Sequence, residues 1–193
     1  MGYLGNQITT VFPTSVSLDT VTTTNLTATN ATASTSLKTP LVEFTDGDDA
    51  IAIADTGVVT MPNQPAFHAN KNGTDQLDYA LNSEVTVTLT HERFDQNGDF
   101  NTSNSTFTAP VTGKYFLNVM CRTDTMDTGA NFYVLCIRTS NEDYRAIIDP
   151  NFSSDLSYFT ERVSILADMD ANDTAFIFIT QSGGTQQADI DGN

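Results

Sequence analysis

Histidine and cysteine, which often carry acid–base and nucleophilic chemistry at neutral pH, are scarce in this chain. Its 193 residues contain two histidines, His68 and His91, and two cysteines. Glu92 follows His91 and would complete an acid–base pair, but a position at the end of a strand-like run is typical of a surface or interface histidine. The sequence has no zinc-protease, nucleophile-elbow, phosphate-loop or dinucleotide-binding pattern. We therefore predict that the protein is not an enzyme.

Carboxylates, by contrast, are numerous, with 24 Asp and Glu. A pair of them could hydrolyse a glycosidic bond, and the sequence leaves this alternative open because it does not show which carboxylates lie close in space. The run Asp46-Gly47-Asp48-Asp49 suggests calcium, but it lacks the further ligands and the distal glutamate of an EF-hand loop. We interpret it as a solvated turn. No cofactor is expected, and whether a structural Ca²⁺ ion is bound stays open.

The two cysteines, Cys121 and Cys136, lie on two apolar runs that flank the segment TDTMDTGAN. A hairpin could bring them together, but two thiols are too few for a disulfide scaffold or a zinc site. Reduced thiols in the core are the favoured interpretation, because cytoplasmic chains keep thiols reduced and cysteine is buried as a small apolar residue.

The charge of the chain is one-sided. Eight Lys and Arg stand against 24 Asp and Glu, which gives a formal net charge of −16. Nucleic acids and anionic membranes require clustered cations, so neither is expected as a direct partner. No stretch approaches the roughly 20 apolar residues of a membrane span, and the N-terminal MGYLGNQITT has neither a basic region nor an apolar signal core. We expect synthesis in a cytoplasm without Sec-type export.

Residues 1–40 form a first region that is rich in Thr, Ser and Asn. Small and medium apolar residues recur in it at a spacing of five, namely Val16, Val21, Leu26 and Ala31. Such a tract cannot bury enough apolar surface alone and has no helical period. It is either a disordered linker or an extended stalk in which several copies of the chain pair with one another, and we favour the stalk.

The N-terminus and the segment 41–62 flank this tract. Tyr3, Leu4 and Ile8, with two glycines, make a small apolar anchor, for which the alternative is an ordinary frayed terminus. Segment 41–62 alternates short apolar runs with Asp- and Gly-containing turns, and it is predicted to be a short β connector.

Residues 63–193 are predicted to be an all-β domain of short antiparallel strands, which favours a sandwich or jelly roll. The run VTVTLTHE alternates, with Val85, Val87 and Leu89 facing one way. The run TAFIFITQ is apolar on both faces, which suggests that a neighbouring subunit covers the second face. The expected strands are 66–69, 84–91, 105–109, 114–123, 131–139, 143–148, 156–168 and 174–181.

The order of motifs in this domain resembles the globular head family of complement component one, subcomponent q. The matching positions are Asn97-Gly98, Phe107, Pro110, Gly113, Tyr115, Leu166, Asp170 and Asp173. The resemblance covers about residues 63–187 and implies the trimeric jelly roll that this family shares with tumour necrosis factor. The family closes with a further Phe-Ser-Gly-like strand near the trimer axis. Here either Ala188-Asp189-Ile190 replaces that strand or the chain is shorter than the usual head.

The whole chain, with MGYLGN, a polar tract, a connector and such a head, resembles virion proteins of tailed bacteriophages, especially fibres of short-tailed marine phages. The resemblance implies a homotrimeric tail fibre or spike that assembles in the host bacterial cytoplasm and resides in the virion. Its N-terminus, with Tyr3, Leu4 and Ile8, would dock on other tail or capsid proteins. Two rivals stay open: a capsid-decorating fibre or tail adaptor that binds no receptor, and a bacterial surface adhesin.

A receptor-binding role implies that three heads bind a host-surface glycan or protein together, so that weak single contacts add up to a useful overall affinity. Recognition is carried by loops more often than by strands, so we expect it in loops 92–104, 124–130 and 149–155. Tyr144, Phe152, Asp149 and Asp155, with Asp143 nearby, would suit carbohydrate or cation binding. The alternative is that these four are ordinary core and turn residues.

Overall fold

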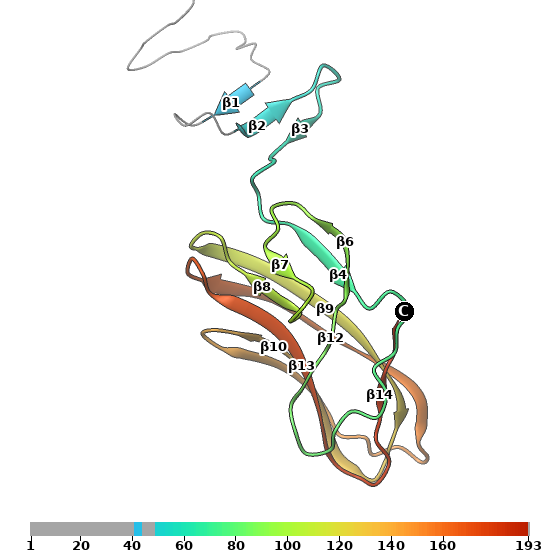
Figure 1. Ribbon diagram of the computed structural model, residues 1–193. Coiled ribbons are helices and arrows are strands. Elements are labelled where there is room, and N and C mark those ends of the chain that lie inside the picture. Colours follow the sequence, from blue (N-terminus) through green and yellow to red (C-terminus); the bar gives the residue numbers. More distant parts are fainter. Residues whose placement is uncertain (1–40, 44–48, 193) are drawn as a thin grey trace, which may run out of the picture. The chain divides into compact units, whose positions relative to one another are not determined.

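The computed structural model describes residues 41–43 and 49–192, and every regular element in this part of the chain is a β-strand (Figure 1). The all-β prediction is confirmed. The proposed docking residues Tyr3, Leu4 and Ile8, the stalk-like tract and turn residues 46–48 lie outside the described residues. The described residues contain no helix long and apolar enough to span a membrane. The strands are β1 (Leu41–Glu43), β2 (Asp49–Ile53), β3 (Val59–Thr60), β4 (Phe67–Asn70), β5 (Val85–Thr86), β6 (His91–Asp95), β7 (Phe100–Asn101), β8 (Thr106–Thr108), β9 (Gly113–Met126), β10 (Ala130–Thr139), β11 (Asp143–Ile148), β12 (Leu156–Met169), β13 (Thr174–Gly183) and β14 (Asp189–Ile190).

Strands β1, β2 and β3 form a small antiparallel sheet in the connector region. A tight turn joins β2 to β3, in which the amide of Gly57 donates to Ala54 O at 2.8 Å. Gly57 has a φ of 82°, a left-handed backbone conformation that residues other than glycine rarely adopt. The Asp-Thr-Gly sequence at 55–57 therefore explains why the two strands reverse there.

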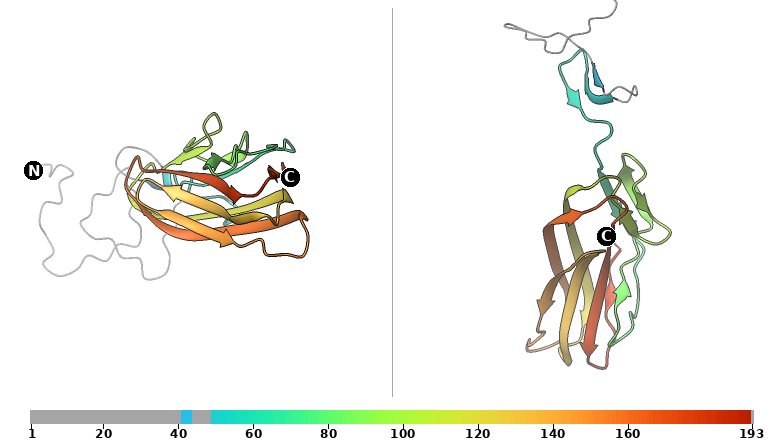
Figure 2. Two further views of the ribbon diagram at one scale, coloured as in Figure 1. Left: turned by 90° about the horizontal axis from the view of Figure 1, so that it is seen from below. Right: turned by 90° about the vertical axis from the view of Figure 1, so that its left-hand side faces the viewer.

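The longer strands form two antiparallel sheets that pack as a sandwich (Figures 1 and 2). The first sheet has the order β11-β10-β13-β8-β7, with β5 also paired to β13, and the second has the order β12-β9-β14. From β8 to β14 the chain passes repeatedly from one sheet to the other, which is the connection pattern of a jelly roll. Strands β4 and β6 pair with each other as a separate ribbon.

Alternating apolar residues build the core between the sheets. Val119 of β9, Leu135 of β10, Val163 of β12 and Ile179 of β13 are buried together. The expected common face of Val85, Val87 and Leu89 is confirmed, and it points inward, since all three pack in this cluster. The predicted strand 84–91 is shorter, however, because the amide of Leu89 donates to the side chain of Ser105 rather than to a neighbouring strand.

The stretch from Phe107 to Arg122 supplies much of this core. Phe107 is buried, and a bend at residues 110–112 leads into β9. The hydroxyl of Tyr115 donates to Val111 O at 2.6 Å and closes the bend. The ring of Tyr115 lies 5.5 Å from that of Phe107. The turn residues and the aromatic residues after them therefore act together to start β9, one of the two 14-residue strands of the sheet.

The two apolar faces of β13 require a correction to the sequence interpretation. Phe178, on the outer face, is only 2% exposed in the single chain. It is covered by Arg138, whose guanidinium carbon lies 4.4 Å from the centre of the Phe178 ring. No neighbouring subunit is therefore needed to cover this residue, because a long side chain from the adjacent strand already does so.

The two cysteines are free and buried. Cys121 lies in the core between the sheets, whereas Cys136 packs with Val134 and Phe178 on the outer side of the first sheet. Burial raises the pKa of Cys121 to about 12 and also raises that of Cys136. Both therefore remain protonated thiols near neutral pH. Cys121 lies in the core as expected, whereas Cys136 is buried on the outer side of the first sheet.

Candidate binding surfaces

The outer face of β9 and β12 carries an exposed apolar patch, which we call the β9–β12 face. Phe116 and Leu166 lie directly opposite each other on the two strands and are 73% and 66% exposed. Met120 and Tyr158 are also exposed on this face. Large apolar side chains gathered on one face of a sheet, rather than scattered, are typical of a surface that contacts another molecule.

Polar and charged pairs border this patch at both ends. At one end Lys114 and Asp168 form an ion pair at 2.5 Å. At the other end Arg122 donates to Asp124 at 2.9 Å and also to Asp191. These bonds, that with Asp124 above all, raise the pKa of Arg122, so the guanidinium is charged at all ordinary pH values. Between Phe116 and Met120, Ser164 donates a hydrogen bond to Asn118 across the two strands, so the face combines apolar and polar groups, as protein–protein interfaces commonly do.

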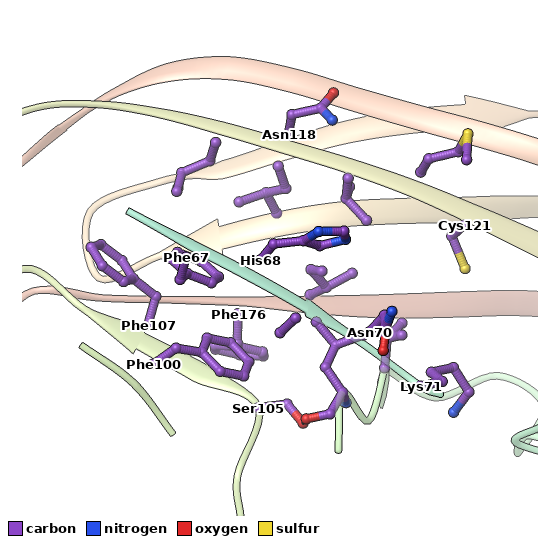
Figure 3. Close-up of a pocket in the computed structure, with 18 of the residues that line it drawn as sticks. Phe67, His68, Asn70, Lys71, Phe100, Ser105, Phe107, Asn118, Cys121 and Phe176 are labelled. Atoms are coloured by element: carbon purple, nitrogen blue, oxygen red, sulfur yellow. The ribbon is translucent and has the colours of Figure 1, made fainter. Parts of the chain in front are cut away.

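A slot opens beside this face, between β9 and β4 (Figure 3), and its volume is 610 Å³. Consecutive residues of both strands line it, 67–71 on one side and 116–122 on the other. Figure 3 shows Phe67, Phe100 and Phe107 together at one end of the slot and Cys121 and Lys71 at the other. The ring of Phe67 stacks on that of Phe100 at 4.9 Å and on that of Phe107 at 5.1 Å. We call this cavity the β4–β9 slot.

The four predicted receptor-binding residues fall into different environments. Tyr144 packs against the core cluster that contains Leu135 and against a second buried cluster that contains Phe100 and Phe107. Asp155 accepts hydrogen bonds from the amide and hydroxyl of Thr128, at 2.9 and 2.7 Å. Phe152 is partly exposed and its ring lies 6.3 Å from that of Phe159, while Asp149 is exposed.

The three predicted recognition loops do not form one surface. The Thr128–Asp155 bonds join loop 124–130 to loop 149–155 at one end of the sandwich. Loop 92–104 lies at the other end (Figures 1 and 2). There the side-chain amide of Gln96 donates to the carbonyls of Met61, Pro62 and Gln64.

The histidine–glutamate pair considered from the sequence is not assembled as an acid–base site. His91 and Glu92 are consecutive residues of β6, so their side chains point to opposite faces of the ribbon. The second histidine, His68, lies on β4 with its ring 6.2 Å from that of Phe94. Among the described residues no group of His, Cys, Asp or Glu is arranged to hold a metal ion.

Asp127 is a structural carboxylate that the sequence did not reveal. It lies in the β9–β10 hairpin, is buried, and accepts hydrogen bonds from the amides of Gly129, Thr185 and Gln186 at 2.6, 2.6 and 2.9 Å. The bond from Gln186 makes the largest contribution to a lowered pKa. This carboxylate therefore fastens the hairpin to the loop that follows β13.

Arg138 is the centre of a second network that the sequence did not reveal. It donates to Asp143 at 2.6 and 2.7 Å and to Glu84 at 2.6 and 2.9 Å. These bonds hold the pKa of both carboxyls below their ordinary values, and hydrogen bonding by Arg138 is the main cause in each case. The network holds Arg138 over Phe178 on the outer side of the first sheet.

Glu161 is a buried carboxyl on β12, opposite Cys121 of β9. Its Oε2 atom has no hydrogen-bond partner among the described residues, and the same holds for the hydroxyls of Tyr79 and Thr123. Burial raises the pKa of Glu161 to about 7 and, together with the nearby charges, that of Tyr79. The interior therefore contains a carboxyl that is largely protonated at mildly acidic pH.

These features define the protein as an antiparallel jelly-roll sandwich with one apolar outer face and an adjoining slot. The chain matches no protein-family model and no curated protein sequence. Among solved structures, it is similar to the globular domain of the zebrafish complement 1qA protein, with 20% identity over 66% of this chain and 93% of that one and a TM-score of 0.45. It also matches an exo-β-1,3-galactanase from Phanerochaete chrysosporium with galactose, at 8% identity over 73% of this chain and 31% of that one and a TM-score of 0.20. At these values neither likeness assigns a family or a function.

Proposed function

We propose that this chain is the subunit of a homotrimeric virion fibre or spike of a tailed bacteriophage, and that its heads associate through the β9–β12 face. The observation that carries the proposal is the cross-strand pair of Phe116 and Leu166, both mostly exposed on that face. Burying exposed apolar surface of this kind against another subunit stabilises the assembly by roughly 25 cal/mol per Å² of apolar area.

The virion setting is supported by the sequence. The polar tract of residues 1–40 precedes a connector and a head, in the order seen in fibres of tailed phages. In this proposal Tyr3, Leu4 and Ile8 dock on another tail or capsid protein, and the head contacts a glycan or protein of the host surface. The protein then assembles in the host cytoplasm and resides in the virion.

The receptor contact is proposed at the end of the sandwich where loops 124–130 and 149–155 meet. Phe152, Asp149 and Asp155 are the exposed members of the four candidate residues, and Tyr144 is partly buried. Asp155 would hold the loop through its bonds with Thr128. Tyr144 lies with Glu142 and Asp168 toward the other end of the sandwich, so it does not take part in this contact. An exposed aromatic ring beside a carboxylate suits a sugar, whose apolar face stacks on the ring while its hydroxyls bond to the oxygens.

The association is tested by the native mass of the full chain, measured by light scattering. The wild-type protein is expected near three times 20.9 kDa. Phe116→Asp should reduce the mass to that of a monomer, because a carboxylate would be buried without a partner in the interface. Ile147→Asp is the matched control, since Ile147 is 66% exposed on the outer side of the other sheet. A wild-type monomer, or equal loss of assembly in both variants, would contradict the proposal.

Two further measurements test whether the protein binds Ca²⁺ and where it lies in the particle. A repeat of the mass measurement with a chelator tests for a structural Ca²⁺ ion, since loss of the trimer would reveal one. Antibody labelling of intact particles places the protein on the tail or the capsid. Capsid labelling would favour the decorating fibre, and absence from purified particles would favour the adhesin.

A further inference from the structure

Strand β9 has one edge that is paired along its length and one that is paired only near its end. β12 pairs with it from Gly113 to Met126. On the other edge, β14 pairs with it at Thr123 and Asp124, and the amide of Asp191 donates to Arg122 O at 3.0 Å. No other described strand pairs with this second edge. It therefore faces the β4–β9 slot as an open strand edge between Gly113 and Cys121.

The bond to Arg122 shows which main-chain groups face the slot. The carbonyl of Arg122 points to the β14 side of β9. Main-chain N–H and C=O groups of a strand point to alternate sides from one residue to the next. The N–H and C=O groups of Phe116, Asn118 and Met120 must therefore point into the slot, as a row of donors and acceptors for another strand.

The opposite wall of the slot is also a strand edge. β4 pairs with β6 on one side, and its residues 67–70 line the slot on the other. At the end of the slot, the chain at Ile190 lies between β9 and Gln76, with which it exchanges hydrogen bonds of 2.8 and 2.9 Å. The amide of Gly73 donates to Gly192 O at 2.8 Å. Here one strand, at Ile190, already lies between β9 and the segment that follows β4, so we infer that the slot beyond it takes one strand.

The floor of the slot is apolar. Side chains from several strands and loops form it, including those of Val87, Leu89, Leu117, Ile137 and Ile177. The residues of β9 from Gly113 to Cys121 span roughly 30 Å at about 3.3 Å per residue. A paired strand of this length would place several side chains on each of its faces. An occupant therefore needs both main-chain hydrogen-bonding groups for the walls and apolar groups for the floor.

We propose that the β4–β9 slot binds one extended strand of a second polypeptide, antiparallel to β9 and in the direction of β14. Its main-chain groups pair with β9 and β4, and its apolar side chains, at alternate positions, rest on the floor. An acyl chain would fill the floor but leave the polar groups of both walls without partners, which favours a peptide. This proposal does not depend on the trimer.

The experiment supplies a strand by fusion, because Gly192 lies at one end of the slot. Eight residues of alternating Val and Thr are added after Asn193 in both registers, since a shift of one residue turns the valines from the floor to the solvent. The matched controls carry Asp in place of Val. Hydrogen exchange of the amides of Phe116, Asn118 and Met120 is then compared at equal oligomeric state, with the β12-facing amides of Leu117 and Val119 as internal controls.

One Val–Thr register is expected to slow exchange of the three slot-facing amides by at least about tenfold relative to its Asp control, and the free Val–Thr peptide should give the same pattern. The proposal is overturned if neither register slows these amides. It is also overturned if they already exchange slowly in the unmodified chain, because the chain's own segments would then fill the slot. Protection by decanoate but not by the peptide would overturn it as well.

Discussion

The ionisation of Glu161 makes the stability of the sandwich depend on pH. Its carboxyl is 6% exposed, and burial raises its pKa to about 7, compared with about 4.3 in an unfolded chain. A group whose pKa is raised by folding binds more protons in the folded state at pH values between these two limits. Its contribution to stability is therefore complete below about pH 4.3 and is lost as the pH rises through about 7.

Glu161→Gln should remove this pH dependence, because the amide has nearly the same shape and does not ionise. Relative to the variant, the wild-type protein should lose on the order of 3 kcal/mol of unfolding free energy between about pH 4.5 and 8. Urea unfolding followed by circular dichroism at a fixed protein concentration measures this difference. Glu92→Gln, on the β4–β6 ribbon, serves as the control for the loss of one carboxylate. Parallel profiles for wild type and Glu161→Gln would show that the carboxyl is not buried.

At the scale of the elements, the Asp127 carboxylate holds the β9–β10 hairpin against the loop between β13 and β14. Its oxygens accept bonds from Gly129 in the hairpin and from Thr185 and Gln186 in the loop between β13 and β14. Asp127→Ala leaves these amides without acceptors and should destabilise the head by on the order of 2–4 kcal/mol. Thermal unfolding measures the loss, with Asp149→Ala as a control of equal charge change. The amides of Thr185 and Gln186 should also exchange faster in the variant, and unchanged exchange there would contradict the assigned bonds.

Alternation made most of the strands predictable from the sequence. Strand 143–148 was predicted with its observed bounds, and 114–123, 131–139 and 156–168 lie within the longer β9, β10 and β12. These runs are rich in β-branched and aromatic residues, so local preference and burial agree. Strand β6, with the sequence HERFD, was missed because it has no apolar alternation and is held by pairing with β4.

The sites were less predictable, because they depend on contacts between distant residues. Arg138 and Glu84 are 54 residues apart, and Asp127 and Thr185 are 58 apart. Their sequence neighbourhoods are ordinary polar turns and strand ends. The exposed pair Phe116 and Leu166 could be seen only once the register of β9 and β12 was fixed, because a shift of one residue would turn both inward.

At the scale of the whole molecule, the net charge of the chain opposes association of copies, whereas its exposed apolar surface favours it. Each chain carries a formal net charge of −16, so copies repel one another at low ionic strength. In the proposed trimer, burial of Phe116, Met120 and Leu166 on the β9–β12 face would offset this repulsion. Salt screens the repulsion, since the Debye length falls from about 30 Å at 0.01 M to about 10 Å at 0.1 M. Assembly through this face should therefore strengthen as salt is added over that range.

The proposed trimer also predicts how the head binds its host. Three heads on one fibre turn the second and third contacts into intramolecular events, which increases overall binding by roughly 10²–10⁴-fold when the geometry allows them together. Phe116→Asp should therefore weaken binding of the labelled protein to host cells by about 10²-fold or more, although Phe116 is not among the proposed receptor residues. Ile147→Asp should bind like wild type. Phe152→Ala should weaken binding while the native mass stays trimeric, because it removes a contact rather than the assembly. Equal binding by the monomeric Phe116→Asp variant and the trimeric wild type would mean that a single head suffices, and the multivalent mechanism would be wrong.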